Sequence, residues 1–247
     1  MCKFWKMAVI FIMMITFVGC GGSNSGSTTI LIGISPDYPP FESLNSNNDM
    51  EGFDIDMVKE LFAIMKKNGG DYDFEFRQMG FETIVTAVNT GQVDLGISGF
   101  TYDEKRDVAW SLPYNDSKQV ALVNANSDIQ TINDLKGKSI GVQLGATAEM
   151  AVQEMDGVTV RAVADVKILI ETLKAGGIDA VVLDQAVARN YQENGSFRMI
   201  DEAMLDEQNY IIAKKTGSEE LMKDINAAIE QFIVSEKYSE LKEKWGV

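Results

Sequence analysis

The chain has 247 residues, with 22 basic and 37 acidic side chains, no histidine and two cysteines. Without histidine it can hold no Ser-His-Asp or Cys-His catalytic couple and no imidazole metal site, and we expect neither a metal nor a cofactor. The net charge of -15 argues against nucleic acid, whose binding requires a basic surface. Both cysteines lie within the first 20 residues, so no disulfide can link parts of the body.

The N-terminus is typical of an export signal. Lys3 and Lys6 precede an uninterrupted apolar run at 8–18 (AVIFIMMITFV). Eleven residues are too few for a permanent transmembrane helix, which needs about 20. We therefore predict a signal peptide at 1–19.

Gly19 and Cys20 follow this run directly, and the segment FVGC resembles the lipobox of bacterial lipoproteins. The resemblance implies that Cys20 is lipidated and becomes the first residue of the mature chain. Residues 20–29 are then the lipidated cysteine and a flexible polar tether, CGGSNSGSTT. The alternative is a plain secretory signal with an incidental cysteine. Under the first interpretation the mature protein is extracytoplasmic, anchored to the membrane by lipid, and more acidic than the precursor.

Short apolar strands alternate with amphipathic helices along the body, in two successive series divided near 114–120. This pattern indicates an α/β fold in which mainly parallel sheets are covered by helices on both faces. We expect Thr216 and Glu219 to form a capping box before the penultimate helix. The expected strands are 30–34, 72–76, 93–97, 139–142, 158–163, 179–183 and 210–213, and the expected helices are 54–68, 81–90, 147–154, 166–175, 218–235 and 238–245.

Polar segments follow four of the predicted strands. Open parallel sheets bind ligands beyond the carboxyl ends of their strands, so these segments are candidates for one common site. They are SPDYPPFE (35–42), SGFTYDEKR (98–106), QLGATAE (143–149) and Asp184.

Together with GFDIDM (52–57) and KYSELKEKWG (237–246), these segments resemble the family 3 extracellular solute-binding proteins, which serve bacterial ABC importers of polar amino acids. The resemblance runs from about residue 30 to residue 246. It implies a two-lobed, type II periplasmic-binding-protein-like fold, with each lobe a mainly parallel sheet flanked by helices. Lobe 1 would comprise 30–117 and 211–247, and lobe 2 would comprise 118–210. Two crossover strands would form a hinge on which the lobes close over a ligand.

A buried amino acid needs a partner for each of its two charges. By its match to the family, Arg106 would hold the α-carboxylate with its planar guanidinium, assisted by the backbone N–H of Thr147. Asp184 would take the α-ammonium, together with the Gly99 carbonyl and the Thr101 hydroxyl. The remaining expected ligand-binding residues are Tyr38 and Phe81, which would sandwich the ligand side chain, and Gln143, Ser98 and Ser35.

Each assignment has a simpler alternative. Arg106 could be a solvated surface charge, Asp184 could only cap the helix that follows it, and the two aromatic residues could belong to the core. Ser35 stands where the family often has an acid, which weakens the case for a cationic ligand without excluding it. The stretch after Arg106 is about two residues shorter than is usual in the family, so its loop could be rebuilt.

The leading hypothesis is that the protein is no enzyme. It would be the substrate-binding component of an ABC transporter, a monomer that captures a polar L-amino acid and delivers it to the membrane permease. A second hypothesis is an extracellular sensor module that presents ligand occupancy to a receptor. A third is a dehydratase-like enzyme on the same fold, for which Glu42, Glu82 or Glu149 would have to donate a proton.

Overall fold

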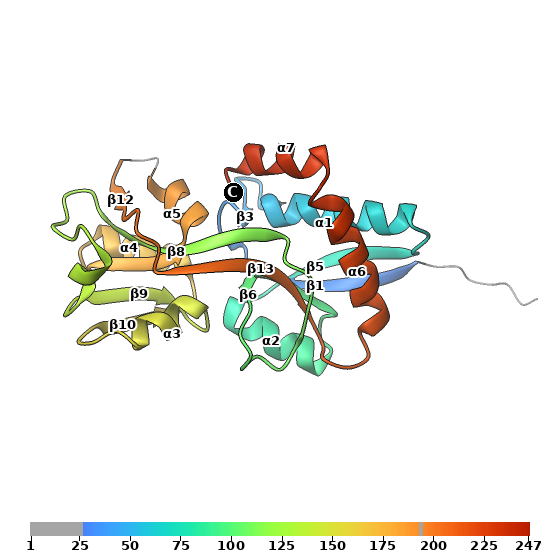
Figure 1. The fold of residues 1–247 in the computed structure, drawn as a ribbon, viewed down its shortest axis with the longest axis horizontal. Coiled ribbons are helices and arrows are strands. Elements are labelled where there is room, and N and C mark those ends of the chain that lie inside the picture. The colour runs from blue at the N-terminus through green and yellow to red at the C-terminus, as the bar shows by residue number, and fades with distance from the viewer. Residues whose placement is uncertain (1–26, 193–194) are drawn as a thin grey trace, which may run out of the picture.

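The structure is a computed structural model that describes residues 27–192 and 195–247 (Figure 1). The predicted signal peptide, Cys20 and most of the predicted tether lie outside the described residues. Within the described part, none of the helices has the length and apolar character needed to span a membrane.

A ten-stranded sheet runs through the whole molecule, with its longest path in the order β10-β9-β11-β8-β13-β6-β1-β5. A small second sheet, β2-β3-β4, lies beside it. The strands of the large sheet are β1 (Thr28–Ile34), β5 (Tyr72–Gln78), β6 (Leu95–Thr101), β7 (Ala109–Trp110), β8 (Asn115–Asn124), β9 (Ser139–Gln143), β10 (Thr159–Val163), β11 (Ala180–Asp184), β12 (Phe197–Met199) and β13 (Leu205–Ala213). Those of the small sheet are β2 (Asp37–Tyr38), β3 (Glu42–Leu44) and β4 (Met50–Glu51).

The large sheet has two parallel groups of strands joined by two long antiparallel ones. Strands β5, β1 and β6 are parallel to one another at one end, and β10, β9 and β11 are parallel at the other. Strands β8 and β13 pair with each other, and each also pairs with one of the two groups. Figure 1 shows both strands passing between the two halves of the molecule. We call the half with β1, β5 and β6 the first lobe and the half with β9, β10 and β11 the second lobe.

Helices cover the sheet in both lobes (Figure 1). Helices α1, α2, α6 and α7 lie on the first lobe and α3, α4 and α5 on the second. The largest apolar cluster has members from both lobes, and each lobe also has a smaller cluster of its own. The helices are α1 (Phe53–Lys67), α2 (Phe81–Thr90), α3 (Thr147–Gln153), α4 (Val166–Lys174), α5 (Gln185–Gln192), α6 (Glu219–Phe232) and α7 (Glu236–Trp245), with a 3-10 helix η1 (Ile132–Leu135).

Local sequence explains several helix ends. Helix α2 ends at Gly91, whose φ of 73° lies in the left-handed region that glycine adopts without strain. Helix α4 begins after Asp165, whose side chain accepts a hydrogen bond from the N–H of Lys167 at 2.7 Å. The predicted capping box of Thr216 and Glu219 is wrong. Helix α6 begins after Ser218, and Glu219 accepts instead from the N–H of Gly217 at 3.0 Å.

The predicted strands and helices all occur, but two boundaries differ in ways that matter for the site. Strand β6 runs to Thr101 rather than ending at residue 97, and β13 begins at Leu205 rather than at residue 210. The two extensions depend on each other, because Thr101 at the end of β6 pairs with Asn209 of β13. The expected elements also lacked α5, β8 and the short strands β2, β3, β4, β7 and β12.

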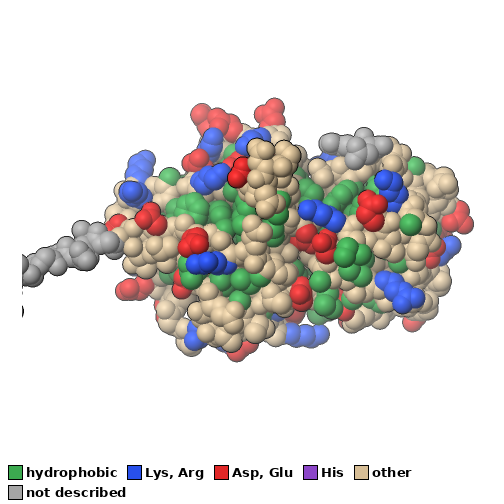
Figure 2. Space-filling model, turned by 180° about the vertical axis from the view of Figure 1, so that it is seen from behind, with side chains coloured by type: hydrophobic (Ala, Val, Ile, Leu, Met, Phe, Trp, Pro, Cys, Tyr) green, Lys and Arg blue, Asp and Glu red, His purple; other side chains and the backbone are tan. Residues whose placement is uncertain are grey.

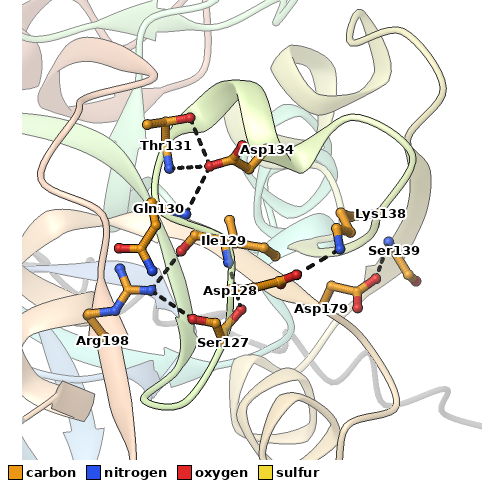
Figure 3. Close-up of polar contacts among 10 residues, drawn as sticks. All are labelled: Ser127, Asp128, Ile129, Gln130, Thr131, Asp134, Lys138, Ser139, Asp179 and Arg198. Atoms are coloured by element: carbon orange, nitrogen blue, oxygen red, sulfur yellow. Dashed lines mark hydrogen bonds and ion pairs between the residues drawn. The ribbon is translucent and has the colours of Figure 1, made fainter.

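The far end of the second lobe is held by polar contacts away from the cleft (Figure 3). Asp134 closes a capping box with Thr131 at the start of η1 and also accepts from the N–H of Gln130. Arg198 of β12 donates to the carbonyl of Ile129 at 2.6 Å and to that of Ser127 at 3.4 Å. These bonds satisfy several backbone groups of the loop, so we assign these polar side chains a structural role.

The surface is acidic overall but mixed in sign locally. On the face seen in Figure 2, Lys and Arg side chains lie separately among acidic ones and leave no continuous basic area. That face therefore lacks the electrostatic character of a nucleic-acid interface.

Candidate functional site

A pocket lies between the two lobes, where β6, β11 and the starts of α2, α3 and α4 meet. Nine of the ten predicted ligand-binding residues line it, and Ser35 does not. The lining residues are Tyr38, Phe81, Ser98, Gly99, Thr101, Arg106, Gln119, Gln143, Ala146, Thr147, Ala148, Val166, Leu169, Val181, Val182, Leu183 and Asp184.

Arg106 points into the pocket from the loop after β6. Its guanidinium donates to the carbonyl of Thr101 at 3.0 Å and to that of Gly145, in the second lobe, at 2.8 Å. Its Cζ lies 5.4 Å from the centre of the Phe100 ring and 5.8 Å from that of Phe81. No carboxylate in the described part of the chain forms an ion pair with it. Since a guanidinium has five N–H groups, donors remain for an anionic ligand group.

Asp184 lies at the end of β11 and is buried. Its carboxylate accepts from the hydroxyl of Tyr38 at 2.7 Å, from the hydroxyl of Ser117, and from Nε2 of Gln119 at 3.3 Å. Burial is the largest influence on it and raises its pKa to about 6. These carboxylate contacts are with side chains of β2 and β8 rather than with the backbone of the helix that follows.

Gly99 and Ser98 form part of the pocket wall on β6. Gly99 has a φ of 59°, which favours glycine, and its carbonyl accepts from Nδ2 of Asn209 at 3.1 Å. One carbonyl lone pair is left for a ligand donor. Thr147 begins α3 on the opposite wall, where helix N–H groups are unpaired within the helix.

A second carboxylate forms hydrogen bonds between the two lobes near Gln143. Asp37, from the first lobe, accepts from the N–H of Val166 at 2.9 Å and from Nε2 of Gln143 at 3.3 Å. Burial raises the pKa of Asp37. The hydroxyl of Ser35 donates to the same carboxylate at 2.7 Å. Ser35 therefore supports an acid in this loop, although it does not line the pocket itself.

Two further carboxylates are fully buried beneath the wall formed by β6. Glu42 accepts from the Ser98 hydroxyl at 2.6 Å, and Asp54 accepts from the Tyr114 hydroxyl at 2.9 Å and the Gly99 N–H at 3.3 Å. Burial raises the pKa of Asp54 to about 7, and it raises that of Glu42 well above its usual range. Burial therefore favours the protonated form of both groups, and through their bonds to Ser98 and Gly99 they stabilise the wall from behind.

Sequence reasoning missed Asp37, Gln119, Ser117 and the half-buried Glu207, whose carboxylate accepts from Gln119 and Thr101. Asp37 stands inside SPDYPPFE and could have been found, because it precedes Tyr38 directly. The others lie on β8 and β13, which carry no recognisable motif.

The geometry does not suit acid–base catalysis by the carboxylates weighed for an enzyme. Glu42 is fully buried below the pocket, and neither Glu82 nor Glu149 lines it. Within 27–192 and 195–247 no group of three or more Cys, Asp or Glu side chains is placed to hold a metal. A cleft between two lobes, with a cation from one lobe and a carboxylate from the other, defines a solute-binding protein.

Comparison with known proteins supports the assignment to the solute-binding proteins. The chain belongs to the bacterial extracellular solute-binding proteins, family 3, whose model matches residues 30–247. This family is non-enzymatic, and the predictions of the fold class and of an extracellular solute-binding function are confirmed.

Among its relatives, the chain is 32% identical to the arginine-binding extracellular protein ArtP of Bacillus subtilis, over 98% of each chain. Among solved structures it resembles an ancestral arginine-binding protein bound to arginine, with a TM-score of 0.80 and 34% identity over 89% of this chain and 99% of that one. The structure of an ancestral arginine-binding protein bound to glutamine matches with a TM-score of 0.80 and 35% identity, over 88% and 97% of the two chains.

Proposed function

We propose that the protein captures a free L-amino acid in the pocket between its lobes and delivers it to the permease of an ABC transporter. The observation that supports this most directly is the placement of Arg106 and Asp184 in one pocket, from different lobes. Neither lobe alone supplies partners for both charges of a zwitterion, so binding the amino acid favours the closed arrangement.

The α-carboxylate is assigned to Arg106 and to the N–H of Thr147. The α-ammonium is assigned to Asp184, the Thr101 hydroxyl and the Gly99 carbonyl. The guanidinium donates to the Thr101 carbonyl of its own lobe, and this bond can hold its plane before the ligand arrives, whereas its bond to the Gly145 carbonyl crosses to the second lobe and belongs to the closed arrangement. Such preorganisation reduces the entropy cost of binding.

The ligand side chain is assigned to the space near Tyr38, Phe81 and Gln143, and we propose that it is cationic, with L-arginine as the first candidate. Asp37 does not line the pocket but contacts Gln143, which does, so its charge lies behind the proposed side-chain site. A guanidinium suits both the aromatic faces and the carboxylate. ArtP and the ancestral arginine-binding protein support this assignment by similarity, and the glutamine complex makes L-glutamine the first alternative.

The ligand is tested by thermal unfolding of the purified full-length protein against each of the twenty amino acids. A ligand at 100 times its dissociation constant adds about 2.7 kcal/mol to the free energy of unfolding. We expect the largest increase in melting temperature with L-arginine. If no amino acid raises the melting temperature or gives heat in titration calorimetry, the proposed function is wrong.

We further propose that the protein acts as a monomer held on the outer face of the membrane through lipid on Cys20. Labelling cells with a radioactive fatty acid should mark the wild type and not Cys20→Ala. The variant should then be found in the medium, because it lacks the cysteine that would carry the lipid anchor. Equal labelling of the two proteins would contradict the anchor.

A further inference from the structure

Glu207 occupies a position beside the pocket that no sequence motif marks. It lies on β13 and pairs in register with Ser117 of β8. Its carboxylate accepts from the hydroxyl of Thr101 at 3.1 Å and from Nε2 of Gln119 at 2.9 Å. Both donors belong to the lining of the ligand pocket. Glu207 therefore stands directly behind two groups that face the ligand.

Gln119 links Glu207 to Asp184. The same Nε2 that donates to Glu207 lies 3.3 Å from Oδ2 of Asp184, so one amide group sits between two carboxylates. Neither carboxylate forms an ion pair with a Lys or Arg of the described residues. Two close carboxylates joined by a neutral donor produce negative potential, which the charge of nearby Arg106 reduces without forming an ion pair, and a ligand cation placed there would relieve it further.

Glu207 also determines what the Thr101 hydroxyl can offer. A threonine hydroxyl has one proton, and here it is donated to Glu207. The oxygen is then left with acceptor sites only. An α-ammonium has three donors and no acceptor, so the Thr101 oxygen is oriented for an ammonium and is unsuited to a ligand acceptor.

We propose that Glu207 is a positioning and specificity-determining residue for the α-ammonium of the ligand. It acts through Thr101, whose hydroxyl it holds as an acceptor, and through its charge beside Asp184. This inference rests on the proposed function, because it takes the amino-acid ligand as given. It adds that the pocket selects ligands with an α-ammonium by means of two carboxylates, one of them outside the pocket lining.

The test compares Glu207→Gln with Asp206→Asn as a matched control. Asp206 is the preceding residue of the same strand, its side chain is 82% exposed, and it faces Lys118 at 3.6 Å. Both variants remove one negative charge from β13 and keep side-chain size. Calorimetry on the full-length proteins would use L-arginine and its desamino analogue 5-guanidinopentanoate. If L-glutamine binds the wild type better, it and its desamino analogue are used.

We expect Glu207→Gln to weaken binding of the amino acid about tenfold and to change binding of the desamino analogue by less than about twofold. Asp206→Asn should leave both affinities unchanged. Equal losses for the two ligands, or no loss for either, would overturn the inference while leaving the proposed function intact. A wild type that binds no amino acid would overturn both.

A double-mutant cycle separates positioning from a general effect on the fold. If Glu207 acts through the Thr101 hydroxyl, Glu207→Gln should cost less in a Thr101→Val background than in the wild type. Additive losses would show that the Thr101 hydroxyl is not the intermediary. Melting temperatures without ligand report any folding defect, and the comparison of two ligands on one variant stays valid despite it.

Discussion

The hydroxyl of Tyr38 and the carboxylate of Asp184 join the two lobes through a hydrogen bond of 2.7 Å. The same hydroxyl accepts from the N–H of Asp184 at 3.0 Å, so the pair is bonded in both directions. The two residues are 146 positions apart in the chain. Because each comes from a different lobe, these bonds connect the two lobes directly, and the closing motion expected of this fold would form them only in the closed arrangement.

Removing only this hydroxyl should therefore weaken the closed state. Tyr38→Phe keeps the ring beside the ligand but loses both bonds, and it leaves the N–H of Asp184 without its partner. We expect binding to weaken by about 1 kcal/mol, roughly fivefold, mainly through faster release. Stopped-flow dissociation and calorimetry measure the effect. Tyr210→Phe is the control, since its hydroxyl bonds to Gln208 within one strand, and an equal effect there would refute the assignment.

The two charged partners should matter more than the hydroxyl. Arg106→Ala or Asp184→Ala leaves one ligand charge buried and unpaired, so we expect a loss of roughly 3 kcal/mol, on the order of a hundredfold in affinity. Lys105→Ala is the matched control for Arg106, because its side chain is exposed one position away. Calorimetry should show unchanged affinity for that control. Unchanged affinity in both pocket variants would disprove the site.

Much of the fold was predictable because its signals are local. Apolar periodicity gave α1 and α4, and glycines marked where helices stop. The extension of β6 through Ser98 and Thr101 was not predictable in this way. It depends on pairing with β13, more than 100 positions further on. A polar and glycine-containing segment is typical of a loop until a distant partner strand fixes it.

The candidate site also contains residues that a local motif marks and residues that only distant strand pairing brings in. Arg106 and Asp184 stand in segments whose order and spacing are distinctive, so sequence alone could nominate them. Glu207 and Gln119 reach the pocket only because β8 and β13 pair across the middle of the sheet. Alternation along β13 tells which residues share a face, but not which face meets the ligand. The boundaries proposed for the two lobes stay a prediction.

Asp37 should control the preference for a cationic side chain. Asp37→Asn keeps the size of the group and removes its charge. We expect L-arginine to bind about tenfold more weakly to this variant, while L-glutamine changes little, because only the guanidinium gains from a carboxylate. The measured quantity is the ratio of the two dissociation constants. A ratio equal to that of the wild type would show that Asp37 only joins the lobes through Val166.

The buried pair of Glu42 and Asp54 should make the ligand-free protein less stable at alkaline pH. Both pKa values are raised, so the folded protein holds more protons than the unfolded chain above about pH 4. The contribution of Asp54 to stability is therefore lost as pH rises through about 7, and that of Glu42 is lost as pH rises through its own raised pKa. Glu42→Gln replaces the titrating carboxyl with a neutral amide that donates at any pH. We expect its melting temperature to fall less than that of the wild type between pH 6 and pH 9.

Circular dichroism melts at both pH values provide the comparison, with Glu51→Gln as a control on exposed β4. That variant should lose as much stability as the wild type over the same range. If Glu42→Gln loses at least as much stability as the wild type, the pKa of Glu42 is not raised by its burial.

Ligand affinity should fall in acid for a different reason. Burial raises the pKa of Asp184 to about 6, and only its ionised form can pair with an α-ammonium. Below this pH the group must first lose its proton, so the apparent dissociation constant should increase about tenfold by pH 5 relative to pH 7.5. Calorimetry across this range measures the profile, and far-UV circular dichroism at each pH checks that the protein stays folded. Asp184→Asn should bind weakly with a flat profile. Tighter binding at pH 5 than at pH 7.5 would mean that the ammonium does not lie on Asp184.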